Sequence, residues 1–161
     1  MSEQPDDRVI HQSPLGQELS DEECRTLTHI MGIRRLKDGE ILVREGEANS
    51  SMHVVIAGQL AVTTTTQGGE TVTLYVLKPG EFAGTRAFVD RTPRKATLRA
   101  MGESEVYVLD PDPFEALLGG HPHLVFSVMR AIFRSVHNLL MRIDMENEQL
   151  VNYINRQHGR Y

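Results

Sequence analysis

The sequence of 161 residues predicts a mainly β fold with flanking helices, an antiparallel sandwich or barrel followed by one long C-terminal helix. Two observations support this fold class. Short β-branched or aromatic runs separated by glycine-containing turns fill the region from Ile33 to Asp110. After Pro122, apolar residues instead recur at alternating spacings of three and four, which is the period of a helix.

The N-terminal region predicts a tail and then a short helix. Residues 1–14 are polar, and we expect them to be flexible. The helix begins after Ser20, because Glu23 follows three residues later as a capping-box partner, and Leu19 faces Cys24 as a hydrophobic staple. The predicted division of the chain is a tail at 1–14, a barrel with short helices at 15–121 and a long helix at 122–161.

The central region predicts strands joined by turns. The expected strands are residues 41–43, 53–56, 60–66, 71–77, 96–101 and 106–109. Gly58 and Gly102 mark two of the turns between them. Residues 67–70, with two central glycines, predict a hairpin, because glycine tolerates positive φ. The connection from Gly84 to Pro93 interrupts this pattern and has room for one helical turn.

After Pro111 opens a short helix, the long helix is expected to run from Pro122 to about residue 156. Its predicted coiled-coil seam is Val125, Met129, Ile132, Val136, Leu139, Ile143, Leu150 and Tyr153. Such a helix is about 51 Å long, more than a compact body of about 120 residues covers. We therefore expect a homodimer paired through this helix. The alternative is a helix folded back on its own barrel over its first half only.

The composition excludes several classes of function. The chain is 40% apolar with a net charge of −5, which suits one core and argues against generic nucleic-acid binding. A lone cysteine excludes an internal disulfide. We find no catalytic motif and no metal spacing beyond His121 and His123, so we expect no enzyme activity, no metal and no required cofactor. The absence of a signal peptide or long apolar run favours a cytoplasmic protein without membrane contact.

One window is electropositive on this acidic chain. Between Arg86 and Arg99 the sequence holds five basic residues and one acid. Glycines before this window let backbone N–H groups approach a ligand closely, and an arginine fork fits two phosphate oxygens. The window therefore predicts an anion-binding site.

The residues of this window resemble the phosphate-binding cassette of the cyclic nucleotide-binding domain in the catabolite activator, or cAMP receptor protein, family. Residues 80–89 read Gly-Glu-Phe-Ala-Gly-Thr-Arg-Ala-Phe-Val and residues 93–98 read Pro-Arg-Lys-Ala-Thr-Leu. The resemblance covers about residues 19–140. It implies an antiparallel double-stranded β-helix, or jelly-roll barrel, with a long C-terminal dimerisation helix. The ligand-binding residues that it implies are Gly84, Thr85, Arg86, Ala87, Arg94, Lys95, Ala96 and Thr97, with Val136, Leu139 and Leu140 on the lid and dimer helix.

The resemblance also implies residue roles. Arg94 would pair with the cyclic phosphate, helped by backbone N–H groups near Gly84 and Ala96. Thr85 stands where the family has a glutamate that accepts from the ribose 2′-hydroxyl. Arg86 and Lys95 add positive charge that the family pattern lacks. At positions 139 and 140, two leucines stand where the bacterial activators place a Thr-Ser pair that reaches the purine.

The implied function is a regulatory sensor. It would bind a small phosphate-bearing ligand such as cAMP or cGMP and signal through its dimer helix to an unidentified protein partner. The added charge leaves open a cyclic dinucleotide or a dicarboxylate. One alternative is a degenerate, ligand-free barrel that acts as a dimeric scaffold or protein-interaction module. Another is a truncated DNA-binding transcription regulator, although the chain ends at Tyr161 without room for a helix-turn-helix, so we expect no DNA contact from it.

Overall fold

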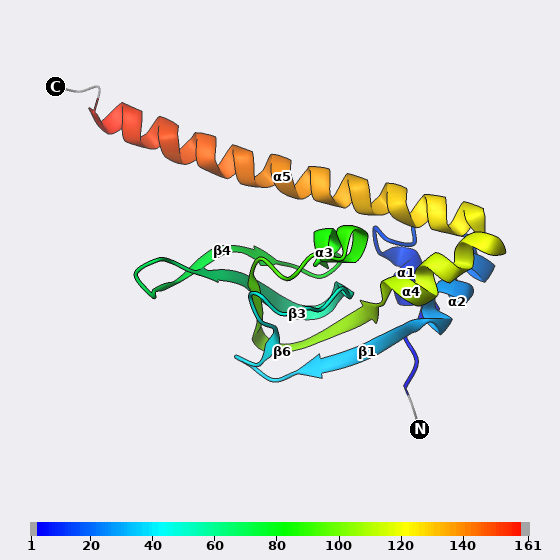
Figure 1. Cartoon of the computed structure of the whole chain (residues 1–161). Coiled ribbons are helices and arrows are strands. Elements are labelled where there is room, and N and C mark those ends of the chain that lie inside the picture. The colour runs from blue at the N-terminus through cyan, green and yellow to red at the C-terminus, as the bar shows by residue number, and fades with distance from the viewer. Residues whose placement is uncertain (1–2, 159–161) are drawn as a thin grey trace.

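The computed structural model describes residues 3–158 and has the predicted fold class, an antiparallel jelly-roll sheet with flanking helices and a long C-terminal helix. Its elements are α1 (Asp7–Gln12), α2 (Asp21–His29), β1 (Met31–Leu36), β2 (Ile41–Val43), β3 (Met52–Thr65), β4 (Thr71–Leu77), β5 (Phe82–Ala83), α3 (Thr85–Asp90), β6 (Thr97–Leu109), α4 (Pro111–Ala116), a 3-10 turn η1 (Leu117–Gly119) and α5 (Pro122–His158). Strands pair in the order β1-β6-β3-β4, while β2 pairs with β6 and β5 with β3. Figure 1 shows α1, α2 and α4 at one end of the sheet and α5 running along the whole body.

Two long strands replace two expected pairs of short strands. The register of β3 against β6 shifts on both sides of Ala57, but the strands continue through this point. Gly58 and Gly102 both have positive φ, which lets each strand bend without ending. The turns predicted at these glycines are therefore irregularities inside strands. The strand β1, which the sequence pattern missed, pairs with β6 from Met31 to Leu36.

The N-terminal residues differ from the expected tail. Residues 7–12 form α1, and the Asp6 side chain accepts a hydrogen bond from the backbone N–H of Arg8. Ile10 is fully buried and Leu15 nearly so, and both belong to the main core cluster. Val9 also packs against this cluster, and the burial of these apolar side chains docks the segment, at about 25 cal/mol per Å² of apolar surface.

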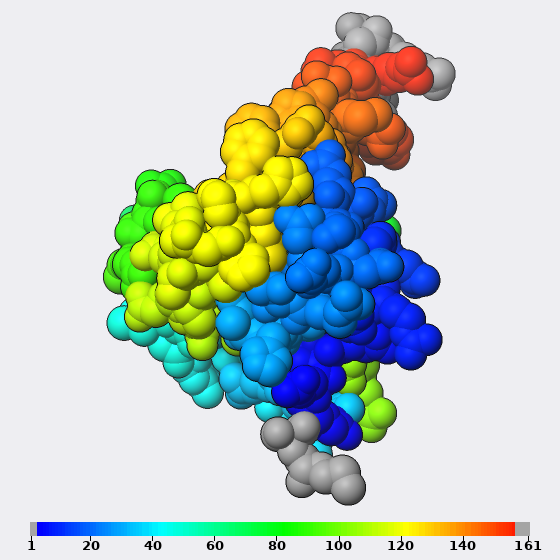
Figure 2. Space-filling view, turned by 90° about the vertical axis from the view of Figure 1, so that its right-hand side faces the viewer, coloured from blue at the N-terminus to red at the C-terminus, as the bar shows by residue number. Residues whose placement is uncertain are grey.

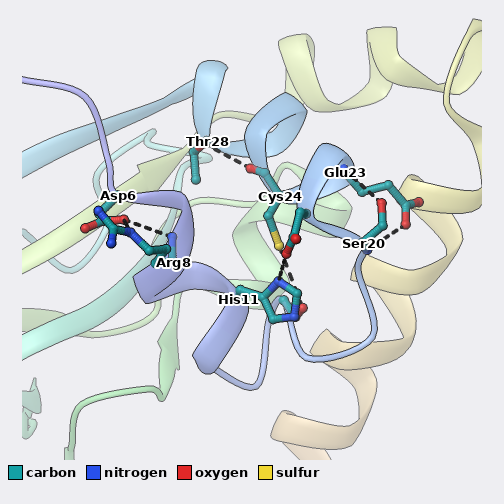
Figure 3. A network of polar contacts seen from close by, with 9 residues as sticks. Asp6, Arg8, His11, Ser20, Glu23, Cys24 and Thr28 are labelled. Atoms are coloured by element: carbon teal, nitrogen blue, oxygen red, sulfur yellow. Dashed lines mark hydrogen bonds and ion pairs between the residues drawn. The ribbon is translucent and has the colours of Figure 1, made fainter.

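The start of α2 confirms the predicted capping box (Figure 3). Ser20 N–H donates to Glu23 Oε1 at 3.0 Å, and Glu23 N–H donates to Ser20 Oγ at 3.1 Å. Cys24 lies in the core behind this cap, and the Thr28 hydroxyl donates to its carbonyl at 2.9 Å. Burial raises the pKa of the Cys24 thiol to about 11, so this cysteine stays a neutral core residue.

The long helix α5 has two unlike halves. In its first half Leu124 and Val128 are fully buried in the main core, and Arg134 pairs with Glu18. Beyond Ile143 every described side chain of the helix is exposed. Figure 2 shows this difference as a yellow segment packed against the blue N-terminal helices and an orange to red segment that rises beyond the body. By length and composition alone, Pro122–Arg156 would also suffice to span a membrane.

The apolar seam predicted along α5 is only partly available to a partner. Val125 and Ile132 are 7% and 4% exposed, because they pack on the core of their own chain. The alternative of a helix folded back over its first half is therefore correct for these positions. Leu150 and Tyr153 of the predicted seam are exposed. Nearer the body, exposed apolar side chains lie one residue after seam positions, at Phe126, Phe133 and Leu140, with exposed fractions of 63%, 73% and 55%.

Candidate ligand-binding site

A cavity of about 540 Å³ lies between the turn before β5, the residues from Gly84 to Leu98, and α5. Its volume is in the range of pockets that hold small organic ligands. The cavity brings together almost all of the predicted site: Gly84, Thr85, Arg86, Ala87, Arg94, Lys95, Ala96, Val136, Leu139 and Leu140 all line it. Thr97 does not line it. Instead its hydroxyl accepts from the Glu45 N–H at 3.0 Å at the start of β6.

Gly84 makes room for the guanidinium of Arg94. This glycine precedes α3 and has a φ of 78°, in the left-handed region that favours glycine. A Cβ added to Gly84 would lie 1.8 Å from Arg94 Nη1, so the guanidinium occupies the space that a side chain would need. The strand-to-helix turn at position 84 and the arginine ten residues later therefore form one unit.

Arg94 is a buried cation whose hydrogen-bond donors are only partly used. Its exposed fraction is 5%, and its Nη2 donates to Asn49 Oδ1 at 2.8 Å and to the Ser51 carbonyl. Its Nε and Nη1 have no hydrogen-bond partner among the described residues. Burial lowers the pKa of the Arg94 guanidinium, and Glu47 opposes this effect from a distance. Because a buried charge with unused donors is unfavourable, this arrangement favours an anion beside Arg94.

His53, on β3, adds a second buried polar group in this region, which the sequence analysis missed. It is 2% exposed, and its Nδ1 has no hydrogen-bond partner within the part of the chain that the structure describes. Burial first, and then the charges of Arg94 and Arg34, lower the pKa of His53 to about 3. The imidazole is therefore neutral at physiological pH. A histidine inside a run of apolar strand residues was the only sequence signal for it.

The α5 side of the cavity is closed by apolar residues and one ion pair. Leu139 lies on the helix face that covers the cavity. Three residues later, Arg142 Nη1 donates to Glu81 Oε1 at 3.0 Å, and Arg142 Nη2 donates to the Val76 carbonyl at 3.1 Å. Glu81 Oε1 also accepts the backbone N–H of Lys78 at 2.9 Å. Arg142 is not among the predicted site residues, although its spacing from Leu139 places it on the same helix face.

The remaining charged residues lie at the rim. Arg86 has a side chain that is 68% exposed and lies 3.7 Å from Asp90. Lys95 is exposed and forms no ion pair within residues 3–158. Thr85 is the first residue of α3 and offers only a neutral hydroxyl. The cavity thus joins a buried cation to a cationic rim, with apolar walls at Val62 and Leu98, and such an arrangement can hold an organic anion.

Comparisons with known proteins agree with this geometry. The family model of the cyclic nucleotide-binding domain matches residues 33–121. A cAMP-dependent protein kinase regulatory subunit of Yarrowia lipolytica is 29% identical over 113 residues, which are 70% of this chain and 29% of that protein. The N-terminal domain of a transcriptional regulator from Streptomyces coelicolor superposes with a TM-score of 0.70 and 27% identity over 84% of this chain and 94% of that one.

The catabolite activator protein of Thermus thermophilus superposes with a TM-score of 0.69 and 27% identity, over 86% of this chain and 63% of that one. This chain therefore spans less than a third of the kinase subunit and less than two thirds of the Thermus protein. The matched segment contains the cavity residues from Glu81 to Leu98. The chain belongs to the cyclic nucleotide-binding domain family.

Proposed function

We propose that this protein is a regulatory sensor that binds a small phosphate-bearing ligand of the cyclic nucleotide type and is not itself an enzyme. The observation that carries the proposal is Arg94, a buried guanidinium in the wall of a ligand-sized cavity, with two nitrogens that have no hydrogen-bond partner among the residues that the structure describes. Relatives named as a kinase regulatory subunit and as a transcriptional regulator support a regulatory role. A cytoplasmic location and a protein partner stay predictions.

The signal would pass through α5. This helix covers the cavity with Leu139 and is tied to the cavity rim by the Arg142–Glu81 pair, while its second half is exposed. A ligand that contacts this lid favours one position of the helix over others, and the exposed half carries that change to a partner.

Calorimetric titration tests the sensor. We expect cAMP, cGMP or a cyclic dinucleotide to release or absorb heat with the parent protein, and Arg94→Ala to abolish the signal, because the anion loses its buried partner. The matched control is Arg99→Ala, since Arg99 is exposed, lies outside the cavity and donates to the Gly39 carbonyl. Silence of the parent with every ligand would favour the ligand-free scaffold.

We also propose that the protein pairs through α5, by the stripe Phe126, Phe133 and Leu140. These three residues are seven apart, and Asn147 continues the spacing. A polar asparagine at one core position is known to fix the register of two-stranded coiled coils. In sedimentation, the double variant Phe133→Glu/Leu140→Glu should be a monomer, while Gln149→Glu, on another helix face, should behave as the parent. A monomeric parent would refute this pairing and leave the sensor proposal intact.

A further inference from the structure

The charged groups around the cavity are strongly unequal. Among the described residues, four cationic side chains line it, those of Arg86, Arg94, Lys95 and Arg142, against one carboxylate, that of Glu81. A ligand in this cavity therefore meets mostly hydrogen-bond donors. Donors of this kind bind the acceptor oxygens of a phosphate, sulfonate or carboxylate, but they cannot accept a hydrogen bond from a ligand hydroxyl.

The one carboxylate is already engaged. Glu81 Oε1 accepts from Arg142 Nη1 at 3.0 Å and from the Lys78 N–H at 2.9 Å, and the pair holds α5 over the cavity. A ligand hydroxyl that took Glu81 as its acceptor would compete with both of these bonds. Because the Glu81 side chain is also only 27% exposed, breaking its pairing with Arg142 carries a desolvation cost.

The other polar groups that line the cavity are neutral. Thr85 offers a hydroxyl at the start of α3, and Ser135 and Asn138 face the cavity from α5. Burial raises the pKa of the Tyr75 phenol, so that this group is also uncharged at neutral pH. The rest of the wall is apolar and comes from residues such as Leu77, which is 1% exposed, on β4.

We infer that this cavity recognises its ligand by an anionic group and an apolar body, and that residues 3–158 supply no free carboxylate there to accept from the hydroxyl groups of a sugar. The ligand class is an organic anion, with a phosphate at Arg94 and a planar or aliphatic body under Leu139. The inference deepens the proposed function and depends on the same cavity. It predicts that a cyclic nucleotide without its 2′-hydroxyl, and an aryl phosphate without any sugar, both bind.

The experiment compares cAMP, 2′-deoxy-cAMP and 1-naphthyl phosphate by calorimetric titration of the parent protein and of Arg94→Ala. A neutral hydroxyl contact is worth at most about tenfold in affinity, whereas a charged contact is worth more than about tenfold. We expect 2′-deoxy-cAMP to bind within about tenfold of cAMP, 1-naphthyl phosphate to compete with both, and Arg94→Ala to lose all three.

The outcomes separate the inference from the proposed function. If cAMP binds and 2′-deoxy-cAMP is more than about tenfold weaker, the inference is overturned and the sensor stands. If only 1-naphthyl phosphate binds, through Arg94, the inference stands and the cyclic nucleotide sensor fails. If none of the three binds, both fail. Thr85→Glu should raise the preference for cAMP over 2′-deoxy-cAMP, and an unchanged preference in a folded variant would overturn the placement of the sugar beside Thr85.

Discussion

Two arginines face the same cavity from opposite sides and are held in opposite ways. Arg142, on α5, has a carboxylate and a backbone carbonyl as partners, and its side chain is 31% exposed. Arg94, which follows α3, is 5% exposed, and within residues 3–158 its guanidinium donates only to a neutral amide oxygen and a backbone carbonyl. Both side chains have the same chemistry, so the difference lies in what surrounds them.

That difference separates a structural contact from a binding group. A guanidinium that is already paired with a carboxylate gains little from an anionic ligand. A guanidinium that is buried without an anion is stabilised when a ligand supplies the anion. The fold keeps Arg94 in this state by two devices. Gly84 leaves space for its guanidinium, and Asn49 orients one of its nitrogens. Substituting Gly84 and breaking the Arg142–Glu81 pair both test this difference.

The largest expected effect is from Gly84→Ala. The new Cβ would overlap Arg94 Nη1 and lie 3.0 Å from the Ser51 carbonyl oxygen, at a φ of 78° that alanine disfavours. We expect a loss of about 3 kcal/mol in the free energy of unfolding, from backbone strain and overpacking together, and a loss of anion binding. Chemical denaturation and calorimetric titration would measure the two effects.

Gly39→Ala is the matched control for this variant. Gly39 has nearly the same φ, 79°, but a Cβ there would meet nothing within 4 Å. Gly39→Ala should lower the free energy of unfolding only by the strain of the left-handed backbone, about 1–2 kcal/mol, and should leave anion binding as in the parent. Equal losses of stability and binding in both variants would show that Gly84 serves the turn rather than the guanidinium.

A second prediction concerns His53 and pH. The pKa of this buried imidazole is lowered to about 3 in the folded state, against about 6.5 when unfolded, so the unfolded chain binds the proton first as pH falls. The contribution of His53 to stability is complete above about pH 6.5. This contribution decreases as the pH falls from about 6.5 towards 3.

Denaturation at pH 7, 6, 5 and 4 measures this effect. In His53→Gln the contribution of this histidine to the slope of unfolding free energy against pH should vanish. The variant should therefore lose less stability on acidification than the parent. His137→Gln, at an exposed position on α5, is the control and should keep the slope of the parent. A variant His53→Gln with the parent slope would mean that groups other than the buried His53 imidazole govern acid unfolding.

The two arginines also differ in whether they can be predicted from the sequence. The spacing from Gly80 to Leu98 was enough to predict Arg94 and its glycine, because both lie within one short segment of chain. Arg142 and Glu81 are 61 residues apart. The local sequence around either residue does not indicate that their side chains form a pair. Thr97 fits the motif but does not line the cavity, and its hydroxyl accepts a hydrogen bond from the Glu45 N–H.

The fold shows the same limit. Local patterns predicted the capping box of α2, the hairpin before β4 and the start of α5 at Pro122, since each depends on neighbours in sequence. Gly58 and Gly102 read as turns because glycine permits both a turn and a bend inside a strand, and only the pairing of β3 with β6 decides between them. Tertiary packing likewise decides which stripe of α5 is buried.

The smallest expected effect is from the Arg142–Glu81 pair. Arg142→Ala and Glu81→Gln should each lower the free energy of unfolding by at most about 1 kcal/mol, because the pair is partly exposed. The double variant should lose less than the sum, since both changes remove one interaction. A ligand should dissociate faster from either single variant, because α5 loses a tie across the cavity.

The pair that holds the other half of α5 supplies the control. Arg134 pairs with Glu18 at the edge of the N-terminal helices, away from the cavity, and its side chain is 49% exposed. Arg134→Ala should therefore cost a similar small amount of stability without changing the rate of ligand dissociation, measured by displacement in a stopped-flow experiment. If Arg142→Ala also leaves this rate unchanged, then Leu139 and its apolar neighbours alone hold the helix over the cavity, and the Arg142–Glu81 pair is a surface contact.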